Sequence, residues 1–429
     1  MIRRRKVLRL RRTQRERTDE QDDKRMKFVP DIFDKEAHKE FRRFLENTGQ
    51  KNWEHKIAKI NSLPFFPSPS PNAYMYYLAS RNPLISHIET YLGFEREGKV
   101  LRKHATPALM KACGYLKLSN ALFHQSKPAG FQKLKSILFD DDTARAFLFE
   151  LDIAVHFFRC GYEVHFVDLQ DLETFDLLVS DGQTELEIEC KTKSADAGRK
   201  ITRGNFYLLC DVLTVELAQV RQDFAVLFKC DGRLSGSQEL FHAVADEIRK
   251  CRVAQRDNGQ VDTLGFEIQN LASGLQIRTN EEAAVALAPH WSPHGHYFVM
   301  SGRNTLIFGC ESTDSDRVLK AIYEDLKRGA DQLSKTRPSM LACQIEDLED
   351  DAWEQLRGNT GLAAMTARLL QSPDRNHVNF VVYSSDKTQP KVGGGITSFS
   401  ATNLSFANKS PKFSIPKSFF GMAKGDEDK

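Results

Sequence analysis

The sequence predicts an α/β protein, and three observations carry that prediction. Hydrophobic stripes at helical spacing alternate along the chain with short apolar segments at strand spacing. The dipeptide Asp181-Gly182, a strong turn signal, separates two of those strand segments. The 429 residues are 41% hydrophobic and include 29 Phe, which is enough for two or three structural units with substantial cores.

We expect five regions in chain order. They are a basic disordered arm at 1–27, a mainly helical region at 28–139, a core of helix, three strands, helix and strand at 140–235, a further α/β region at 236–385 and a disordered tail at 386–429. The tail is assigned from its high content of Ser, Lys, Gly, Pro and Phe.

The core begins with a helix that we expect to run to about Cys160. Asp141 or Asp142 can cap its N-terminus, and Gly161 is a suitable C-terminal stop. The residues that form its apolar stripe are Phe147, Leu151, Ala154 and Phe158. Glu150 lies at the margin of this stripe, where a carboxylate is costly to bury unless a positive group meets it.

Three strands should follow this helix: Tyr162 to Val167, and the two arms of a hairpin within 174–194, TFDLLVSDGQTELEIECKTKS. Side chains alternate along a strand, so Glu189 and Lys191 project on one face. The opposite, core-facing row consists of Leu186, Ile188 and Cys190. An acid on the first arm, Asp176, completes a set that can hold a hard divalent cation beside a phosphate.

The register of the hairpin decides which acid faces Asp176. A two-residue loop at Asp181-Gly182 places Asp176 opposite Glu187, whereas a four-residue loop ending at Thr184 places it opposite Glu189. Both loop lengths are common, so Glu187 remains a rival ligand. We favour Glu189, since it lies two residues from the next lysine on the same face.

A second helix at 205–222 and a strand at 224–230 complete the core, in the order helix, three strands, helix, strand. This order, with Asp176 and the Glu189-Cys190-Lys191 triplet, resembles the PD-(D/E)XK nuclease superfamily, which has the restriction-endonuclease-like fold. The resemblance covers residues 140–230. One departure is Phe175, which stands where the family pattern has Pro.

The resemblance implies a function and a set of site residues. Asp176 and Glu189 would bind Mg²⁺, for which Mn²⁺ could substitute, and Lys191 would orient or activate the attacking water. Glu150 matches the acid that many members carry on the first helix. Two carboxylates would leave open positions on the cation for water and a phosphate oxygen.

Four basic residues follow the triplet: Lys193, Arg199, Lys200 and Arg203. They could contact the phosphates that flank the cleaved bond, which would fix the position of a nucleic acid without reading its sequence. The alternative is an exposed basic loop.

Charge is distributed unevenly. Residues 1–17 contain nine Arg or Lys and one Glu, although the whole chain has a formal net charge of only +3. A basic arm on a mildly acidic body can tether nucleic acid, or it can be a solubilising tail. The arm has no apolar run of signal-peptide length and no segment approaches a membrane span, so we expect a cytoplasmic protein without membrane contact.

The other regions show element patterns but no clear chemistry. Helical patterns lie at 34–60, 74–92, 106–122, 235–250, 314–333 and 347–370, strand patterns lie at 297–300, 305–310, 340–345 and 378–383, and a Pro/Ser linker lies at 64–71. His290, His294 and His296 have no acid or Cys at ligand spacing, so a zinc site is not favoured. The eight Cys form no CxxC pair, which indicates free thiols.

The sequence therefore predicts a Mg²⁺-dependent nuclease, with DNA favoured over RNA, in a restriction or anti-phage role and able to form homo-oligomers. The alternatives are a catalytically inactive nucleic-acid-binding protein on the same fold, and a scaffold or immunity-type protein whose acidic strand face is solvated. No Walker A loop, GxGxxG fingerprint or nucleophile elbow is present, so nucleotide hydrolysis and acyl transfer gain no support.

Overall fold

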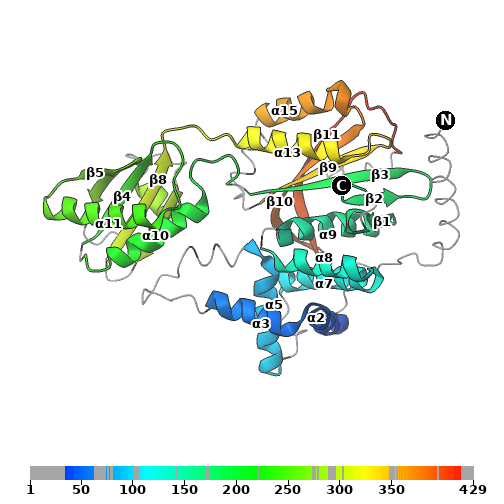
Figure 1. Ribbon diagram of the computed structural model, residues 1–429, viewed down its shortest axis with the longest axis horizontal. Coiled ribbons are helices and arrows are strands. Elements are labelled where there is room, and N and C mark those ends of the chain that lie inside the picture. Colours follow the sequence, from blue (N-terminus) through cyan, green and yellow to red (C-terminus); the bar gives the residue numbers. More distant parts are fainter. Residues whose placement is uncertain are drawn as a thin grey trace.

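The fold was derived from a computed structural model of the chain, and it is α/β (Figure 1). The structure describes residues 34–416 except 62–73, 75–76, 78–80, 100–105, 142, 171–172, 195, 221, 273–276, 278–279, 288–295, 302–303, 347–352, 354–355, 357, 359 and 394–395. The basic arm, the Pro/Ser linker, His290 and His294 therefore lie outside the described residues, and the predictions for them stay predictions.

The first sheet of the described chain has the strand order β1-β2-β3-β9-β10-β11. Its strands are β1 (Glu163–Phe166), β2 (Leu177–Ser180), β3 (Glu185–Ser194), β9 (Ser339–Glu346), β10 (Val378–Gly393) and β11 (Ile396–Ala407). Strand β9 runs parallel to both β3 and β10, and the other pairs are antiparallel. Because parallel strands need covering on both faces, helices must lie on each side of this sheet.

The hairpin β2–β3 has the register that places Asp176 opposite Glu189. Leu177 pairs with Ile188, and the next pair outward along the same register is Asp176 and Glu189. The loop spans residues 181–184, where the Asp181 amide donates to the Thr184 carbonyl at 3.3 Å. The Asp181 carboxylate also accepts from the amides of residues 183 and 184, which favours the longer loop. The prediction of a four-residue loop is therefore confirmed.

Helices cover both faces of the first sheet (Figure 1). One face packs on α9 (Thr143–Arg159) and contributes Leu186, Ile188 and Cys190 to a core, as predicted for that row. The opposite face packs on α13 (Val318–Gln332) and α15 (Thr360–Leu370). The Asp140 carboxylate accepts from the Thr143 amide at 2.9 Å and caps α9, whereas Asp141 or Asp142 was predicted as the cap.

The region before α9 is helical, as predicted. Its helices are α2 (Asp34–Thr48), α3 (Gln50–Asn61), α5 (Pro83–Arg96), α7 (Pro107–Gln125) and α8 (Pro128–Phe139). The indole of Trp53 stacks on Phe139, with ring centroids 4.3 Å apart, and this contact joins α3 to α8. The whole layer packs against α9 and extends the core on that face of the sheet.

A second sheet has the strand order β5-β6-β4-β8-β7. Its strands are β5 (Asn258–Val261), β6 (Leu264–Asn270), β4 (Phe224–Cys230), β8 (Thr305–Ser312) and β7 (His296–Ser301), and its helices are α10 (Arg203–Glu216), α11 (Gln238–Val253) and α12 (Asn280–Leu287). The strands predicted at 297–300 and 305–310 are confirmed as β7 and β8, and they pair antiparallel. Ser237 caps α11 by accepting from the Leu240 amide at 3.2 Å, so the helix begins within the pattern predicted at 235–250.

The prediction that α10 and β4 continue the sheet of β1–β3 is wrong. Both elements form, but β4 pairs with β6 and β8 in the second sheet. Strand β4 is buried along nearly its whole length, so its apolar pattern indicates an interior strand without indicating its neighbours. The strand beside β3 is β9, and the helix before β9 is α13.

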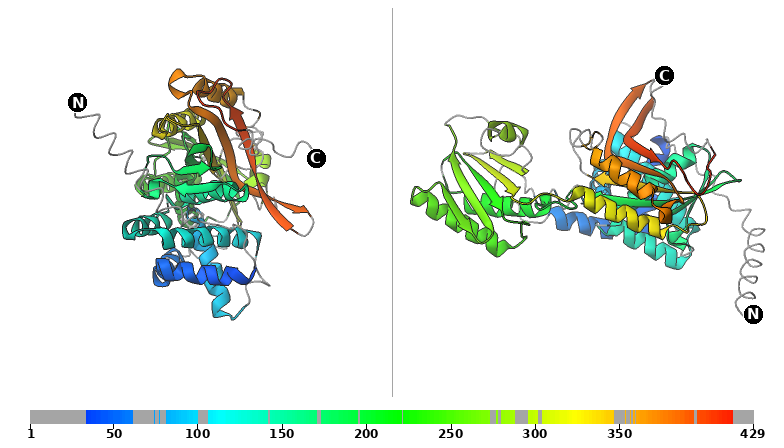
Figure 2. Two further views of the ribbon diagram at one scale, coloured as in Figure 1. Left: turned by 90° about the vertical axis from the view of Figure 1, so that its right-hand side faces the viewer. Right: turned by 90° about the horizontal axis from the view of Figure 1, so that it is seen from above.

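The chain therefore leaves the first sheet after β3 and returns to it with α13 and β9 (Figure 2). The outgoing and returning segments touch where the Arg317 amide donates to the Gly198 carbonyl at 2.7 Å. Gly198 has φ +77°, and a Cβ on it would lie 2.6 Å from the Arg317 carbonyl oxygen. This close approach requires glycine.

The prediction of a disordered tail from residue 386 is wrong for the segment that the structure describes. Strand β10 continues to Gly393 and pairs with β11, and the Asn379 side chain donates to the Phe413 carbonyl at 2.7 Å. In β11, Leu404 and Phe406 pack on the core beneath α15. Ser405 separates Leu404 from Phe406 at strand spacing, a pattern that composition alone concealed.

Two further observations bear on the sequence predictions. All eight Cys are free thiols, as expected, and only Cys160 is exposed. Within the described part of the chain, no helix combines the length and the apolar character that crossing a membrane requires.

Candidate metal centre

Three carboxylates from separate elements converge at one end of the β1–β2 pair. Glu150 comes from α9, Asp168 from a short 3₁₀ turn (Asp168–Gln170) after β1, and Asp176 from the residue before β2. One carboxylate oxygen from each lies within 4.8 Å of the others. Glu150 and Asp176 were predicted as site residues, whereas Asp168 was missed. Its one sequence signal is its place directly after a short strand.

Asp176 is held by the neighbouring strand. Its Oδ2 accepts a hydrogen bond from the Cys190 amide at 2.6 Å, which fixes the carboxylate against β3. Burial raises the pKa of Asp176 to about 6, although the Cys190 amide and the Lys191 ammonium both oppose the rise. Desolvation therefore outweighs two favourable contacts.

Glu189 is the most deeply buried acid of the site, with 1% of the residue exposed. Its Oε1 pairs with the Lys191 ammonium, but its Oε2 is buried and has no hydrogen-bond partner. Burial raises the pKa of Glu189 to about 8, and the Asp176 carboxylate adds to this rise. A buried carboxylate oxygen without a partner carries a large desolvation cost, which a bound cation would offset.

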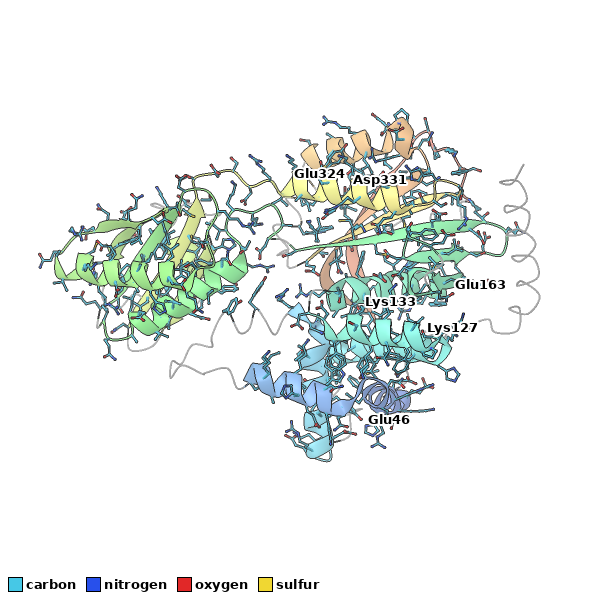
Figure 3. The ribbon with its side chains drawn as sticks, in the orientation of Figure 1. Glu46, Lys127, Lys133, Glu163, Glu324 and Asp331 are labelled. Atoms are coloured by element: carbon cyan, nitrogen blue, oxygen red, sulfur yellow. The ribbon has the colours of Figure 1, made fainter. Side chains whose placement is uncertain are left out.

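The acids repel one another as well as resisting burial. Burial raises the pKa of Glu150 well above its usual range, and the carboxylates of Asp176 and Asp168 raise it further. The ammonium of Lys133, from α8, lies 3.7 Å from Asp168 Oδ2 (Figure 3). Clustered carboxylates with oxygen ligands only are the donor set that Mg²⁺ and Mn²⁺ prefer, so the residues fit a hard divalent cation.

Lys191 lies on the same face of β3 as Glu189, as predicted. A Cβ added to Gly329 of α13 would meet Glu189 Cγ and Lys191 Cε, both at 3.2 Å, so both side chains run beneath that helix. The ammonium of Lys191 also donates to the side-chain oxygen of Gln332 at 2.6 Å. Gln332 was not singled out from the sequence, because it lies far along the chain and belongs to the returning helix.

Glu187, the rival ligand, has partners of its own. It is fully buried, and it accepts hydrogen bonds from the Ser334 amide at 2.8 Å and from the Ser334 hydroxyl. The guanidinium of Arg337 lies 3.4 Å from it. Glu187 therefore holds the loop between α13 and β9 and takes no part in the acidic cluster.

The four basic residues after the triplet do not form an exposed loop. Lys193 pairs with Asp325, Lys200 with Asp314 at 2.6 Å, and Arg203 with Asp196 at 3.4 Å, while Arg199 is partly buried. The Lys193 pair links β3 to α13, the Lys200 pair links the outgoing segment to the returning one, and the Arg203 pair lies within the outgoing segment. Contact with nucleic-acid phosphates would have to compete with them, and that role stays a prediction.

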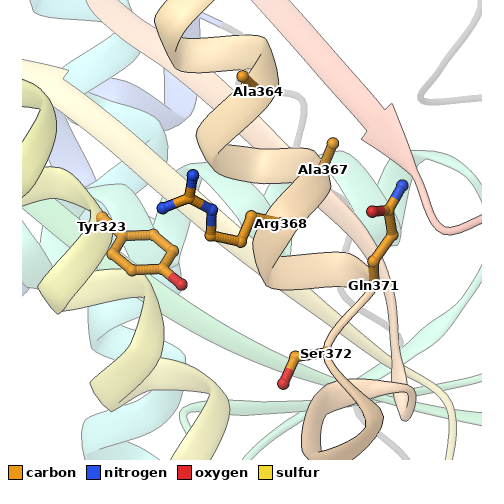
Figure 4. Close-up of a pocket in the computed structure, with 6 residues that line it drawn as sticks. All are labelled: Tyr323, Ala364, Ala367, Arg368, Gln371 and Ser372. Carbon is orange, nitrogen blue, oxygen red and sulfur yellow. The ribbon is translucent and has the colours of Figure 1, made fainter.

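A groove of about 550 Å³ lies between α13 and α15 (Figure 4). The residues that line it are Tyr323, Ala364, Ala367, Arg368, Gln371 and Ser372. None of the clustered acids reaches it. We place the candidate site at the acids, because holding these carboxylates close together and away from water costs free energy that a bound cation would offset.

The arrangement can bind a divalent cation between carboxylates and present one ammonium group beside it. That combination suits hydrolysis of a phosphate ester, where charge develops on oxygen. In the comparisons with known proteins, no family model matches the chain, and no curated protein or solved structure shows significant similarity to it.

Proposed function

We propose that this protein is a Mg²⁺-dependent nuclease that hydrolyses phosphodiester bonds in DNA. The observation that carries the proposal is the cluster of Glu150, Asp168 and Asp176, with the Glu189–Lys191 pair near enough to act on it electrostatically. The three clustered acids come from three separate elements and are partly buried, whereas acids on a solvated sheet face would lie on one element and be exposed. The unpartnered Oε2 of Glu189 further supports a cation there.

Asp176 and Glu189 are the proposed ligands, and Glu150 and Asp168 add negative charge around them. Mg²⁺ bound there would lower the pKa of a coordinated water and neutralise charge on the phosphate. The Cys190 amide keeps Asp176 aimed at the site through its hydrogen bond to Oδ2. The buried surroundings of Glu189 strengthen its attraction for a cation, because fewer waters screen it.

Lys191 supplies the positive group. Its side chain is 23% exposed, and its ammonium contacts Glu189 and Gln332. From this position it can orient the attacking water and stabilise negative charge on phosphate oxygens. It lacks the lone pair of a metal ligand, so its loss should abolish cleavage and leave cation binding intact.

The test is cleavage of linear and circular DNA, and of RNA, by the full chain in Mg²⁺ or Mn²⁺. Asp176→Ala and Glu189→Gln should abolish cleavage, whereas Lys191→Ala should abolish it while Mn²⁺ still binds by titration calorimetry. Glu163→Gln is the matched control, because Glu163 is an exposed carboxylate on β1 outside the cluster (Figure 3). Cleavage by Asp176→Ala at the wild-type rate would overturn the proposal.

The same preparations separate the other functions. Salt-sensitive DNA binding without metal-dependent cleavage would indicate an inactive nucleic-acid-binding protein. Absence of both binding and cleavage would favour a scaffold. If the protein acts in restriction or anti-phage defence, cells that carry Asp176→Ala should lose protection against phage.

A further inference from the structure

Gln332, the last residue of α13, makes a side-chain contact on each of its two polar atoms. Its Oε1 accepts from the Lys191 ammonium at 2.6 Å, and its Nε2 donates to the Thr174 carbonyl at 3.1 Å. Thr174 lies two residues before Asp176. One amide therefore joins the lysine of the site to the segment that carries one of its acids.

The position of Gln332 is fixed by further contacts. The Thr174 hydroxyl donates to the Gln332 backbone carbonyl, so these two residues are linked twice. Two residues after Gln332, Ser334 donates its amide and hydroxyl to the buried carboxylate of Glu187. Because these partners lie on β3 and beside β2, the end of α13 is tied directly to the strands of the site.

Lys191 needs a second hydrogen-bond partner, because Glu189 would have to bind both the lysine ammonium and the proposed cation. The Lys191 ammonium pairs with Glu189 Oε1, and the other oxygen of the same carboxylate is buried and unpartnered. A divalent cation on Glu189 would repel the ammonium and weaken that pair. Gln332 offers the lysine a neutral acceptor that does not compete for the metal.

We propose that Gln332 is a positioning residue that holds the Lys191 ammonium beside the acidic cluster when a cation occupies Glu189. This inference rests on the proposed nuclease function for its kinetic part. Its structural part, that Gln332 orders the lysine ammonium, stands on the geometry alone. A hydrogen-bonded lysine presents its ammonium in one place, and catalytic groups depend on such placement.

The structural part is tested first on the full chain with Mg²⁺ and without substrate, because in the metal-free protein the pair with Glu189 would also hold the Lys191 ammonium. With ¹⁵N-labelled lysine, a hydrogen-bonded ammonium that exchanges slowly with water gives a resolved NMR signal. The Lys191 signal is assigned by its disappearance in Lys191→Arg. It should be present in the wild type, lost to exchange in Gln332→Ala and retained in Asp331→Asn, the exposed neighbour on α13 (Figure 3).

The kinetic part is tested at saturating Mn²⁺ and DNA. Gln332→Ala should lower kcat about 10- to 100-fold, as loss of an outer-shell partner typically does, with KM and Mn²⁺ affinity unchanged. Gln332→Glu keeps an acceptor for Lys191 but cannot donate to Thr174, so it should recover part of kcat. If Gln332 had only a structural role, Gln332→Glu would instead lower kcat as much as Gln332→Ala does.

The possible outcomes distinguish a failure of the nuclease proposal from a failure of the positioning role of Gln332. If the wild type does not cleave nucleic acid, the nuclease proposal fails, while the NMR result still decides whether Gln332 holds the lysine. If the wild type cleaves and Gln332→Ala keeps both the Lys191 signal and kcat, the positioning role is wrong. Thr174→Val serves as the folding control, because it removes the second Thr174–Gln332 link and leaves the Lys191 contact in place.

Discussion

Glu187 and Glu189 lie two residues apart on the same face of β3 and are almost fully buried, at 0% and 1% exposure. Replacing each with Gln should nevertheless have opposite effects. Glu187 has hydrogen-bond donors on both oxygens, whereas Glu189 has an oxygen with none. The comparison therefore separates a structural carboxylate from a ligand carboxylate with the smallest possible chemical change.

Glu187→Gln should destabilise the protein. Gln offers one acceptor oxygen in place of two, so one of the two bonds from Ser334 is lost, and a hydrogen bond to a charged group contributes about 1.5–3 kcal/mol. Arg337 also lies 3.7 Å from Glu173 and 3.4 Å from Glu185, and these two carboxylates limit the additional cost of losing the charge of Glu187. We expect a loss of about 2–3 kcal/mol in the free energy of unfolding, with Mn²⁺ binding retained.

Glu189→Gln should leave the stability of the metal-free protein unchanged or raise it at pH 8. Burial and the Asp176 carboxylate raise the pKa of Glu189 to about 8, so ionising it costs folding free energy that a neutral amide does not. The same substitution removes a ligand, so Mn²⁺ binding should be lost.

Urea denaturation followed by circular dichroism, with Mn²⁺ titration calorimetry on the same samples, measures both effects. The reasoning is refuted if Glu187→Gln loses Mn²⁺ binding while Glu189→Gln retains it, because Glu187 would then be the ligand. Equal stability of wild type and Glu187→Gln would show that the Ser334 bonds contribute little.

Three other predictions follow from the site and the sequence. Asp168→Asn should weaken Mn²⁺ binding by calorimetry, with Glu163→Gln as the unaffected control, and equal affinities in both would remove Asp168 from the site. The pKa values of Asp176 and Glu189 are raised to about 6 and about 8, so the folded chain binds more protons than the unfolded chain between the ordinary carboxyl pKa of about 4 and these raised values. Thermal stability without metal should therefore fall as pH rises from about 6 to 8, and added Mn²⁺ should reverse the trend; a rise with pH would contradict it. Deleting residues 1–17 should flatten the dependence of DNA affinity on salt at similar cleavage rates, and an unchanged slope would leave the arm without a phosphate-binding role.

The local part of the site could be predicted because turn chemistry and strand alternation are local. Asp181-Gly182 and the alternation of acids with Leu186 and Ile188 were enough to put Asp176 opposite Glu189. The structure bears out both that register and the inward orientation of Cys190. The α/β class followed from the same periodicities.

The part of the site that could not be predicted from the sequence depends on contacts between segments that lie far apart along the chain. Gln332 meets Lys191 only because the chain returns to the first sheet after forming a second one. Local apolar patterns identified β4 and β9 equally well as strands, but they do not record which strand each one joins. Asp168 sits in a short turn with no periodic signal, and its role emerges only when α9 brings Glu150 against it.

The central claim is that the acids hold a divalent cation for cleavage, and the most direct measurement is anomalous X-ray scattering from crystals of the full chain grown with Mn²⁺. We expect a peak between the carboxylates of Asp176 and Glu189, about 2.0–2.5 Å from an oxygen of each, as hard cations bind carboxylates. The peak should vanish in Asp176→Ala. A wild-type crystal with no peak at these acids, under conditions where the protein cleaves DNA, would contradict the claim.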